Sequence, residues 1–165
     1  MSDISPVYTE MRDTLLAVSP ETSSMAPTDD LRRVYGVLID IGFEVLFTVA
    51  AYADGTTSVY NGNGGGSAGL GDVADLAMMS RAMIRSVEAN LDEFKPVEST
   101  PLPAFGRVRF TVLTYDGRLG VNADGAALIK GQHKLSKPFA AAMTIMERAR
   151  QLTAAKAKGA EAGES

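Results

Sequence analysis

Apolar residues recur at helical spacing near the start of the chain. Ser5-Pro6 is typical of an N-cap followed by proline in the first helical turn. The apolar stripe that follows is Tyr8, Met11, Leu15 and Val18. This spacing predicts a short amphipathic helix that ends at Pro20. Residues 19–30, rich in Ser, Thr, Pro and Asp, are expected to form a loop.

From Val34 to Ala53 the chain is almost continuously apolar, which is long enough to raise the question of a membrane span. However, Asp40 lies near its centre, Gly42 interrupts it and β-branched residues are frequent. Two consecutive buried strands, over residues 34–41 and 43–52, explain the pattern better, because a strand covered on both faces is apolar throughout. Asp54-Gly55 then predicts a two-residue hairpin turn into a third strand over residues 57–60.

A glycine-rich run over residues 61–71 precedes the most regular helical pattern, over residues 72–92, which Asp72 is expected to cap. Pro96, Pro101 and Pro103 mark a linker. Alternation then predicts a strand over residues 107–115, a tight turn at Asp116-Gly117 and a partner strand over residues 119–122. A further turn at Asp124-Gly125 leaves room for a short strand over residues 127–129. The last helix begins at Ser136, and its predicted buried side is Phe139, Met143, Met146, Ala149 and Arg150.

These elements predict a single α+β domain over residues 1–152 and a flexible C-terminal tail over residues 153–165, where the sequence has low complexity. The expected order is helix, three strands, helix, two or three strands, helix. Because hairpins dominate, the five- or six-stranded sheet is expected to be mostly antiparallel. The three helices are expected on one face, with the possibility that one face is left for a partner.

Composition narrows the classes of function. The 165 residues carry a net charge of −4, and the 16 basic residues are scattered, which argues against a nucleic-acid partner. Cysteine is absent, which excludes disulfides, thiolate metal sites and a thiol nucleophile. No secretory signal is visible at the N-terminus. We therefore expect a cytoplasmic protein with no membrane partner.

Three segments carry a resemblance to known proteins: residues 36–42, residues 53–60 with the glycine run, and residues 101–110. Together they resemble a group of small bacterial proteins of unassigned function, a likeness that covers most of residues 33–150 and implies no activity or site residues. The architecture is also similar to that of roadblock and longin-type domains, which wrap a five-stranded antiparallel sheet with helices and act as dimerising regulatory platforms. Those domains usually place two strands before the central helix, where three are predicted here.

The glycine-rich run is the first candidate site. The amides of Gly64, Gly65 and Gly66, with Ser67, could form a nest for an anionic small molecule at a helix N-terminus. However, the Gly-Lys-Ser/Thr ending of a phosphate-binding loop is missing. A flexible connection that needs positive φ explains the glycines as well and is favoured.

Catalytic and metal sites find little support. His133 is the only histidine, and it is expected to be a solvated loop residue. Asp54, Asp116 and Asp124 each stand before glycine, as turn residues do. Asp40 differs, because a carboxylate inside an apolar strand must be paired, exposed at a strand end or costly; a strand-end position is favoured. No catalytic residue, metal ligand or cofactor is predicted.

Methionines on the helix over residues 72–92 suggest a different role. Met79 and Met83 widen its apolar stripe, and core packing is the first explanation. The apolar faces of the helices nevertheless look wide for one small sheet, so these two residues are candidates for a homodimer interface. The leading hypothesis is a non-catalytic interaction or regulatory module that self-associates or binds another protein. A small-molecule-binding protein using residues 61–71 is second, and an enzyme is third.

Overall fold

The computed structural model describes residues 4–163 of the chain. The α-helices within them are α1 (Pro6–Leu16), α2 (Pro20–Ser23), α3 (Ala74–Glu88), α4 (Gly125–Ile129) and α5 (Ser136–Gly163). The strands are β1 (Val34–Gly42), β2 (Leu46–Tyr52), β3 (Thr57–Asn61), β4 (Gly66–Ser67), β5 (Lys95–Pro96), β6 (Arg107–Thr114) and β7 (Gly117–Asp124). Two 3-10 turns, η1 (Leu70–Asp72) and η2 (Leu91–Glu93), flank α3.

The seven strands form one sheet in the order β4-β3-β2-β1-β6-β7-β5, and each ladder is antiparallel. Strand β1 lies at the centre between β2 and β6, and all nine of its residues are buried. The apolar stretch from Val34 is therefore two consecutive strands, as predicted. Within the described residues, no helix combines the length and the apolar character needed to cross a bilayer.

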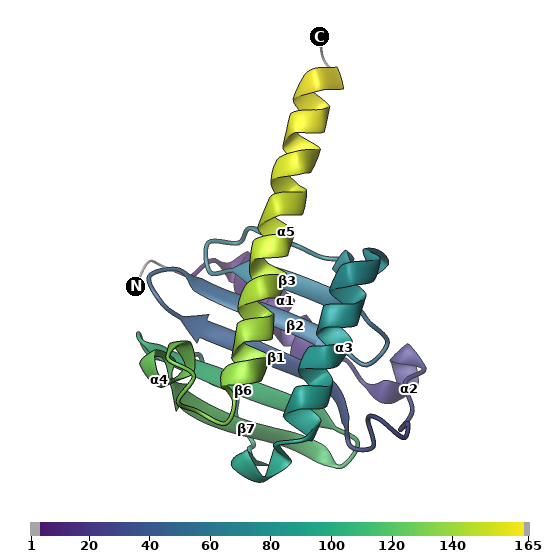
Figure 1. Cartoon of the computed structure of the whole chain (residues 1–165), viewed down its shortest axis with the longest axis vertical. Coiled ribbons are helices and arrows are strands. Elements are labelled where there is room, and N and C mark those ends of the chain that lie inside the picture. The colour runs from purple at the N-terminus through teal and green to yellow at the C-terminus, as the bar shows by residue number, and fades with distance from the viewer. Residues whose placement is uncertain (1–3, 164–165) are drawn as a thin grey trace.

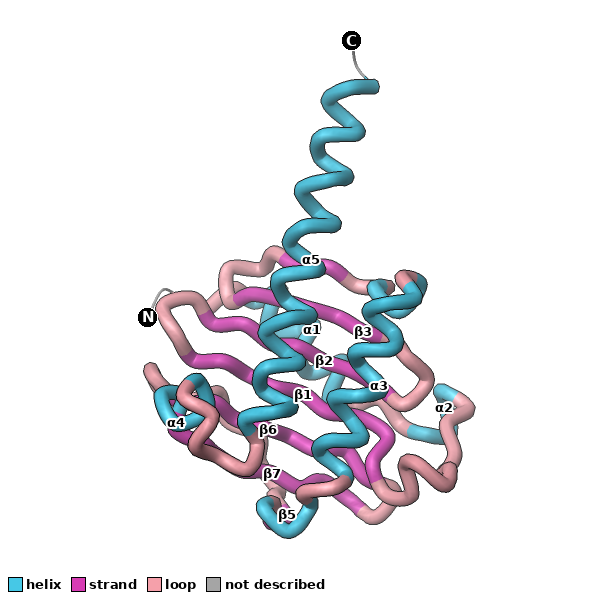
Figure 2. The backbone as a smooth tube through the Cα atoms, in the orientation of Figure 1, coloured by secondary structure: helices cyan, strands magenta, loops and turns pink. Residues whose placement is uncertain are grey.

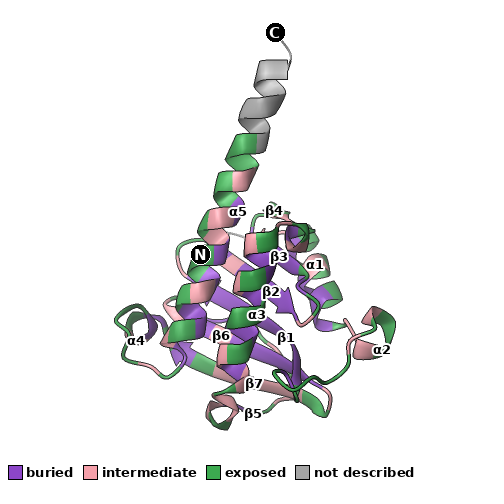
Figure 3. Ribbon diagram, turned by 45° about the vertical axis from the view of Figure 1, so that its right-hand side comes forward, coloured by how far each residue is buried: buried purple, intermediate pink, exposed green. Residues whose placement is uncertain are grey.

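Helices cover both faces of the sheet, which corrects the expectation of a single covered face. Figures 1 and 2 show α3 and α5 side by side on one face and α1 on the other. The larger apolar core lies under α3 and α5 and includes Ile39, Val49 and Ile145. A smaller cluster under α1 joins Leu15 and Leu16 to the opposite side of the strands. Figure 3 shows the strands buried between these layers.

The predicted α+β antiparallel architecture is confirmed, but the number of elements differs. Two strands of only two residues each, β4 and β5, lie at the sheet edges, and α2 and α4 are additional short helices. Helix α4 replaces the short strand expected over residues 127–129. The reason is local: the Asp124 side chain accepts a hydrogen bond from the Ala127 amide at 3.3 Å and caps a helical turn.

The connection into α3 also differs from the prediction. The glycine-rich run first forms the β3–β4 hairpin and then η1, so it does not lead directly into a helix. Helix α3 begins at Ala74 with Val73 at the N-cap position and no side-chain cap, rather than at Asp72. It ends at Glu88, four residues before the predicted end at 92.

Helix α5 is the longest element at 28 residues, and its C-terminal turns project beyond the edge of the sheet (Figure 1). Leu152 packs against the core, whereas residues 153–155 are exposed. The helix continues to Gly163 through most of the segment predicted as a tail; residues 164–165 lie outside the described residues. Two residues assigned to its buried side, Met143 and Arg150, are exposed.

Candidate functional site

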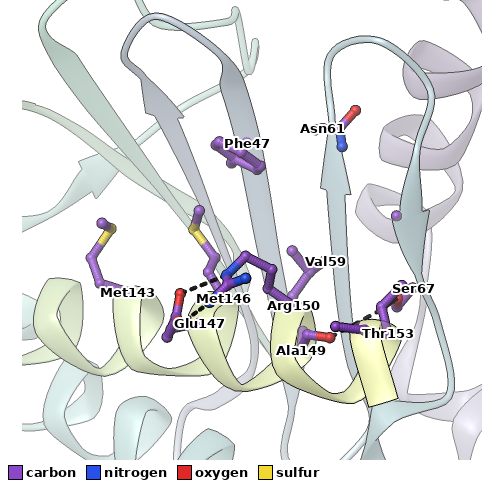
Figure 4. Close-up of a pocket in the computed structure, with 12 residues that line it drawn as sticks. Phe47, Val59, Asn61, Ser67, Met143, Met146, Glu147, Ala149, Arg150 and Thr153 are labelled. Atoms are coloured by element: carbon purple, nitrogen blue, oxygen red, sulfur yellow. Dashed lines mark hydrogen bonds and ion pairs between the residues drawn. The ribbon is translucent and has the colours of Figure 1, made fainter. Parts of the chain in front are cut away.

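A groove beside α5 has a cavity volume of about 660 Å³. We call it the α5 groove. The sheet contributes Phe47, Val59, Asn61, Gly66 and Ser67. The helix contributes Met143, Met146, Glu147, Ala149, Arg150, Thr153 and Ala154. Figure 4 shows Phe47 and Val59 between the strands and α5, with the two methionines along the helix.

The floor of the α5 groove follows from strand register. Phe47 pairs with Asn61 and Val59 pairs with Ser67, so the four residues form adjacent cross-strand pairs of β2, β3 and β4. Side chains two residues apart on a strand share a face, which places the floor on the side of the sheet that α5 crosses. Phe47 stays partly exposed, and this end of β2 and β3 therefore offers an apolar surface that α5 covers only in part.

The wall of the groove follows from helical spacing. Met143, Met146, Arg150 and Thr153 are three or four residues apart and lie along one side of α5. Met143 is 37% exposed to solvent, and Met146 is partly buried against the core. Methionine side chains are flexible and polarisable, so this wall can adapt to the shape of an apolar partner.

One exposed ion pair lies at the rim of the groove. Arg150 donates to Glu147 through Nε at 3.0 Å and Nη2 at 2.5 Å. The hydrogen bond from Arg150 lowers the pKa of Glu147, and the same bond raises the pKa of Arg150. Because the two charges neutralise each other, the groove has no net charge with which to select an ion.

Uncharged polar groups lie at the β4 end of the groove. The hydroxyls of Ser67 and Thr153 are hydrogen-bonded at 3.2 Å, and Asn61 stands nearby on β3. A second hollow of about 420 Å³ continues beyond this pair along Leu70 and Leu152. The arrangement suits contact with an apolar surface that carries few polar groups.

The four residues of the predicted anion nest, Gly64 to Ser67, lie in two different environments. The Gly64 amide donates to the Asn61 carbonyl at 3.0 Å, and the Gly65 amide donates to the Asn61 and Asn63 side-chain oxygens. Both amides therefore already donate hydrogen bonds within the turn. Gly64 has a φ of 98°, a backbone conformation that favours glycine, as expected for a flexible connection that needs positive φ. Gly66 and Ser67, by contrast, line the α5 groove.

The two methionines proposed for an interface, Met79 and Met83, both belong to α3. Met83 has no exposed surface and belongs to the core of the protomer, while Met79 is partly buried against the same core. The methionine that α3 exposes is Met78, at 64%. The sequence shows three methionines on this helix, but the one that stays exposed depends on which side of α3 the sheet and α5 cover.

His133 and the turn aspartates have structural roles. His133 Nδ1 accepts from the Leu135 amide at 3.0 Å, and Asp54 Oδ1 accepts from the Thr56 amide at 2.9 Å. Asp124 caps α4, and Asp116 lies in the turn between β6 and β7. Among the side chains that the structure describes, residues 4–155, no three His, Asp or Glu groups are close enough to hold a metal ion.

Asp40 lies on the opposite face of the sheet and is fully buried, which corrects the expectation of a strand-end position. Arg12 of α1 donates to both of its carboxylate oxygens, at 3.1 and 2.9 Å, and also to the Thr100 carbonyl at 2.7 Å. Thr48 donates to Asp40 at 2.6 Å, and the Tyr8 and Thr48 hydroxyls are 2.5 Å apart. We call these four side chains the Asp40 network.

The Asp40 network fastens α1 to the sheet. Burial raises the pKa of Tyr8 to about 12, and the neighbouring Asp40 carboxylate adds to the effect. Each carboxylate oxygen of Asp40 is already paired within the protomer. The network therefore presents no open group to a ligand, and the α5 groove remains the better candidate site.

Comparison of the chain with models of known protein families, with curated proteins and with solved structures gave no significant match. The interpretation of the groove therefore rests on its own geometry. Sequence reasoning did not identify Phe47 and Val59 as site residues. An apolar residue on a strand carries no signal of whether a helix will cover it.

Proposed function

We propose that the protein is a non-catalytic interaction module that functions as a homodimer, with the α5 groove as the surface that meets its partner. One observation carries this proposal: an apolar groove with no net charge runs along a helix that extends past its own domain. Burying such a groove against another protein is favourable, because it removes apolar side chains from water.

A charge placed in the groove tests the proposal. Met143→Glu introduces a carboxylate at an exposed position, so the fold is retained while association would have to desolvate the charge. Light scattering should show a dimer for the wild type at micromolar concentration and a monomer for the variant. Met78→Glu is the matched control, because this methionine is also exposed on a helix but lies outside the groove.

Two results would count against the proposal. A wild-type monomer at micromolar concentration removes self-association. A variant Met143→Glu that remains as dimeric as Met78→Glu places the interface elsewhere on the molecule. Circular dichroism of both variants checks that the secondary structure is unchanged.

A second function has one observation in its favour. The groove volume of about 660 Å³ falls within the range of small-molecule sites, and Gly66 and Ser67 line it. Native mass spectrometry of the purified protein separates this function from the first, because it reports subunit number and retained ligand together. A monomer carrying a bound small molecule would favour the second function.

A further inference from the structure

We propose that Asn63 is a site of spontaneous covalent modification, where the side-chain amide becomes a carboxylate through a cyclic imide formed with Gly64. The site lies in the turn between β3 and β4 and needs no partner, so it is separate from the proposed function. The attacking group is the backbone nitrogen of the following residue, and glycine hinders this attack least because it has no side chain. The chain contains two Asn-Gly pairs, Asn61-Gly62 and Asn63-Gly64, and both lie where β3 turns toward β4.

The reaction needs water as its only co-reactant. The Gly64 nitrogen attacks Cγ of Asn63, so a bond forms between these two atoms and the bond from Cγ to Nδ2 breaks. The proton of the Gly64 amide leaves with Nδ2 as ammonia. Water then opens the imide at one of its two carbonyl carbons. Opening at Cγ gives aspartate, and opening at the main-chain carbonyl gives isoaspartate, in which the main chain runs through the side chain.

The carbon under attack has similar surroundings in the two asparagines. The Gly65 amide donates to Asn63 Oδ1 at 3.0 Å and to Asn61 Oδ1 at 3.2 Å. Negative charge develops on this oxygen as the nitrogen adds to Cγ, and an N–H donor stabilises that charge. The difference between Asn61 and Asn63 must therefore come from the amide that attacks each of them.

The two attacking amides differ in burial and in hydrogen bonding. Gly62 is buried, and its amide donates to the Leu46 carbonyl at 2.7 Å, which extends the pairing of β2 with β3. Gly64 is half-buried, and its amide donates to the Asn61 carbonyl at 3.0 Å, a bond within the turn. A bond at the tip of a turn opens at a lower free-energy cost than one that extends a sheet. The Gly64 nitrogen is therefore free to attack more often, and the exposed Asn63 side chain can rotate toward it.

The two products differ in their effect on the turn. Aspartate at position 63 keeps the main chain unchanged, and its carboxylate still accepts from the Gly65 amide. Isoaspartate lengthens the main chain by one carbon atom in a turn that must place Gly66 opposite Tyr60. Because β4 pairs with β3 at two positions only, we expect the isoaspartate form to loosen β4 from the sheet edge.

Peptide mapping by mass spectrometry tests the site during incubation of the full chain at neutral pH. In water labelled with heavy oxygen, residue 63 should become a mixture of aspartate and isoaspartate, each carrying one heavy oxygen atom. We expect Asn63 to convert at least about tenfold faster than Asn61, which corresponds to a difference of about 1.4 kcal/mol in the free energy of opening. Asn63→Gln should abolish conversion at this position, because the longer side chain would have to close a larger ring.

The chain unfolded in guanidinium is the matched control. There the two Asn-Gly pairs have no structure to distinguish them, so Asn61 and Asn63 should convert at similar rates. Equal rates in the folded protein would overturn the proposal, as would an Asn63 that reacts only in guanidinium. Aspartate without any isoaspartate would also overturn it, because opening of an imide gives both products.

Discussion

The face of the sheet beneath α1 buries Asp40, Arg12 and Thr48 in one hydrogen-bonded network, whereas the face beneath α3 and α5 is lined mainly by apolar side chains. Buried polar groups need hydrogen-bond partners at fixed positions, so α1 can pack on its face of the sheet in one position only. The polar groups of the Asp40 network are then paired within the protomer. Apolar contacts are not directional, so the other face can be covered in part by α5 and in part by a partner. The first face is therefore closed by pairing within the protomer, whereas the second leaves part of its apolar surface open.

The largest expected change in the free energy of unfolding comes from a variant in the Asp40 network, on the α1 face. Asp40→Asn removes the charge that compensates Arg12, whose side chain is only 9% exposed. Breaking a buried ion pair by removing one partner costs about 3–5 kcal/mol. The free energy of unfolding, measured by urea denaturation, should fall by that amount.

A double variant controls for the loss of the charge alone. Arg12→Met combined with Asp40→Leu removes both charges and fills the space with apolar groups, which in other buried pairs is often neutral or stabilising. We expect it to be more stable than Asp40→Asn. A single variant as stable as the wild type would mean that the network does not fasten α1, and the two faces would no longer differ in this way.

The apolar face is tested by two methionines of one helix. Met83→Ala leaves a cavity in the core under α3 and should lower the free energy of unfolding by about 2–5 kcal/mol. Met78→Ala, on the exposed side of the same helix, should change it by no more than about 0.5 kcal/mol. Equal losses in the two variants would show that the exposed side of α3 is covered in solution.

The pattern of residues predicts the central strands and fails at the shortest elements, for physical reasons. Strand β1 is buried on both faces and β6 on most of its length, and runs of eight or nine residues carry enough positions to reveal this. A two-residue strand such as β4 or β5 has no period to detect. Helix α4 depends on one cap, Asp124, which the same Asp-Gly signal presents as a turn.

The candidate sites show a similar division. That Asp40 needs a partner follows from its place in an apolar strand, but that the partner is Arg12, 28 residues earlier, depends on where α1 docks. Met143 has the spacing of a buried residue, yet it is exposed beside the ends of β2 and β3, which α5 covers only in part. Sequence periodicity describes one element, whereas exposure depends on the neighbours of that element.

Alkaline pH should weaken the α1 face selectively. The pKa of Tyr8 is raised by burial from about 10 in the unfolded chain to about 12 in the fold. The native state then holds its proton more tightly than the unfolded state, so this contribution is complete below pH 10 and is lost as the pH rises through about 12. Two pKa units correspond to about 2.7 kcal/mol.

Burial also raises the pKa of Tyr52, so the wild type loses stability at alkaline pH through more than one tyrosine. The variant Tyr8→Phe isolates the part of this loss that comes from Tyr8. Urea denaturation across this range should show a shallower decline for Tyr8→Phe than for the wild type. Parallel declines would mean that the Tyr8 hydroxyl is open to solvent and that the network is not closed.

The smallest expected change in the free energy of unfolding is a gain rather than a loss. Thr111 lies on β6 opposite Leu38, on the α1 side of the sheet, and is 1% exposed. Its hydroxyl has no hydrogen-bond partner within the described residues, unlike the hydroxyl of Thr48 in the same sheet. Thr111→Val keeps the shape and removes the unpaired polar group, so the free energy of unfolding should rise by about 1 kcal/mol.

Thr48→Val is the matched comparison, since it deletes a hydroxyl that bonds both Asp40 and Tyr8. That variant should lose about 1–3 kcal/mol, because the buried Tyr8 hydroxyl loses its partner and Asp40 Oδ1 keeps only its bond from Arg12 Nε. Opposite signs for the two threonines would show that pairing, rather than polarity itself, stabilises the α1 face. A loss in Thr111→Val would instead mean that the Thr111 hydroxyl is paired in solution.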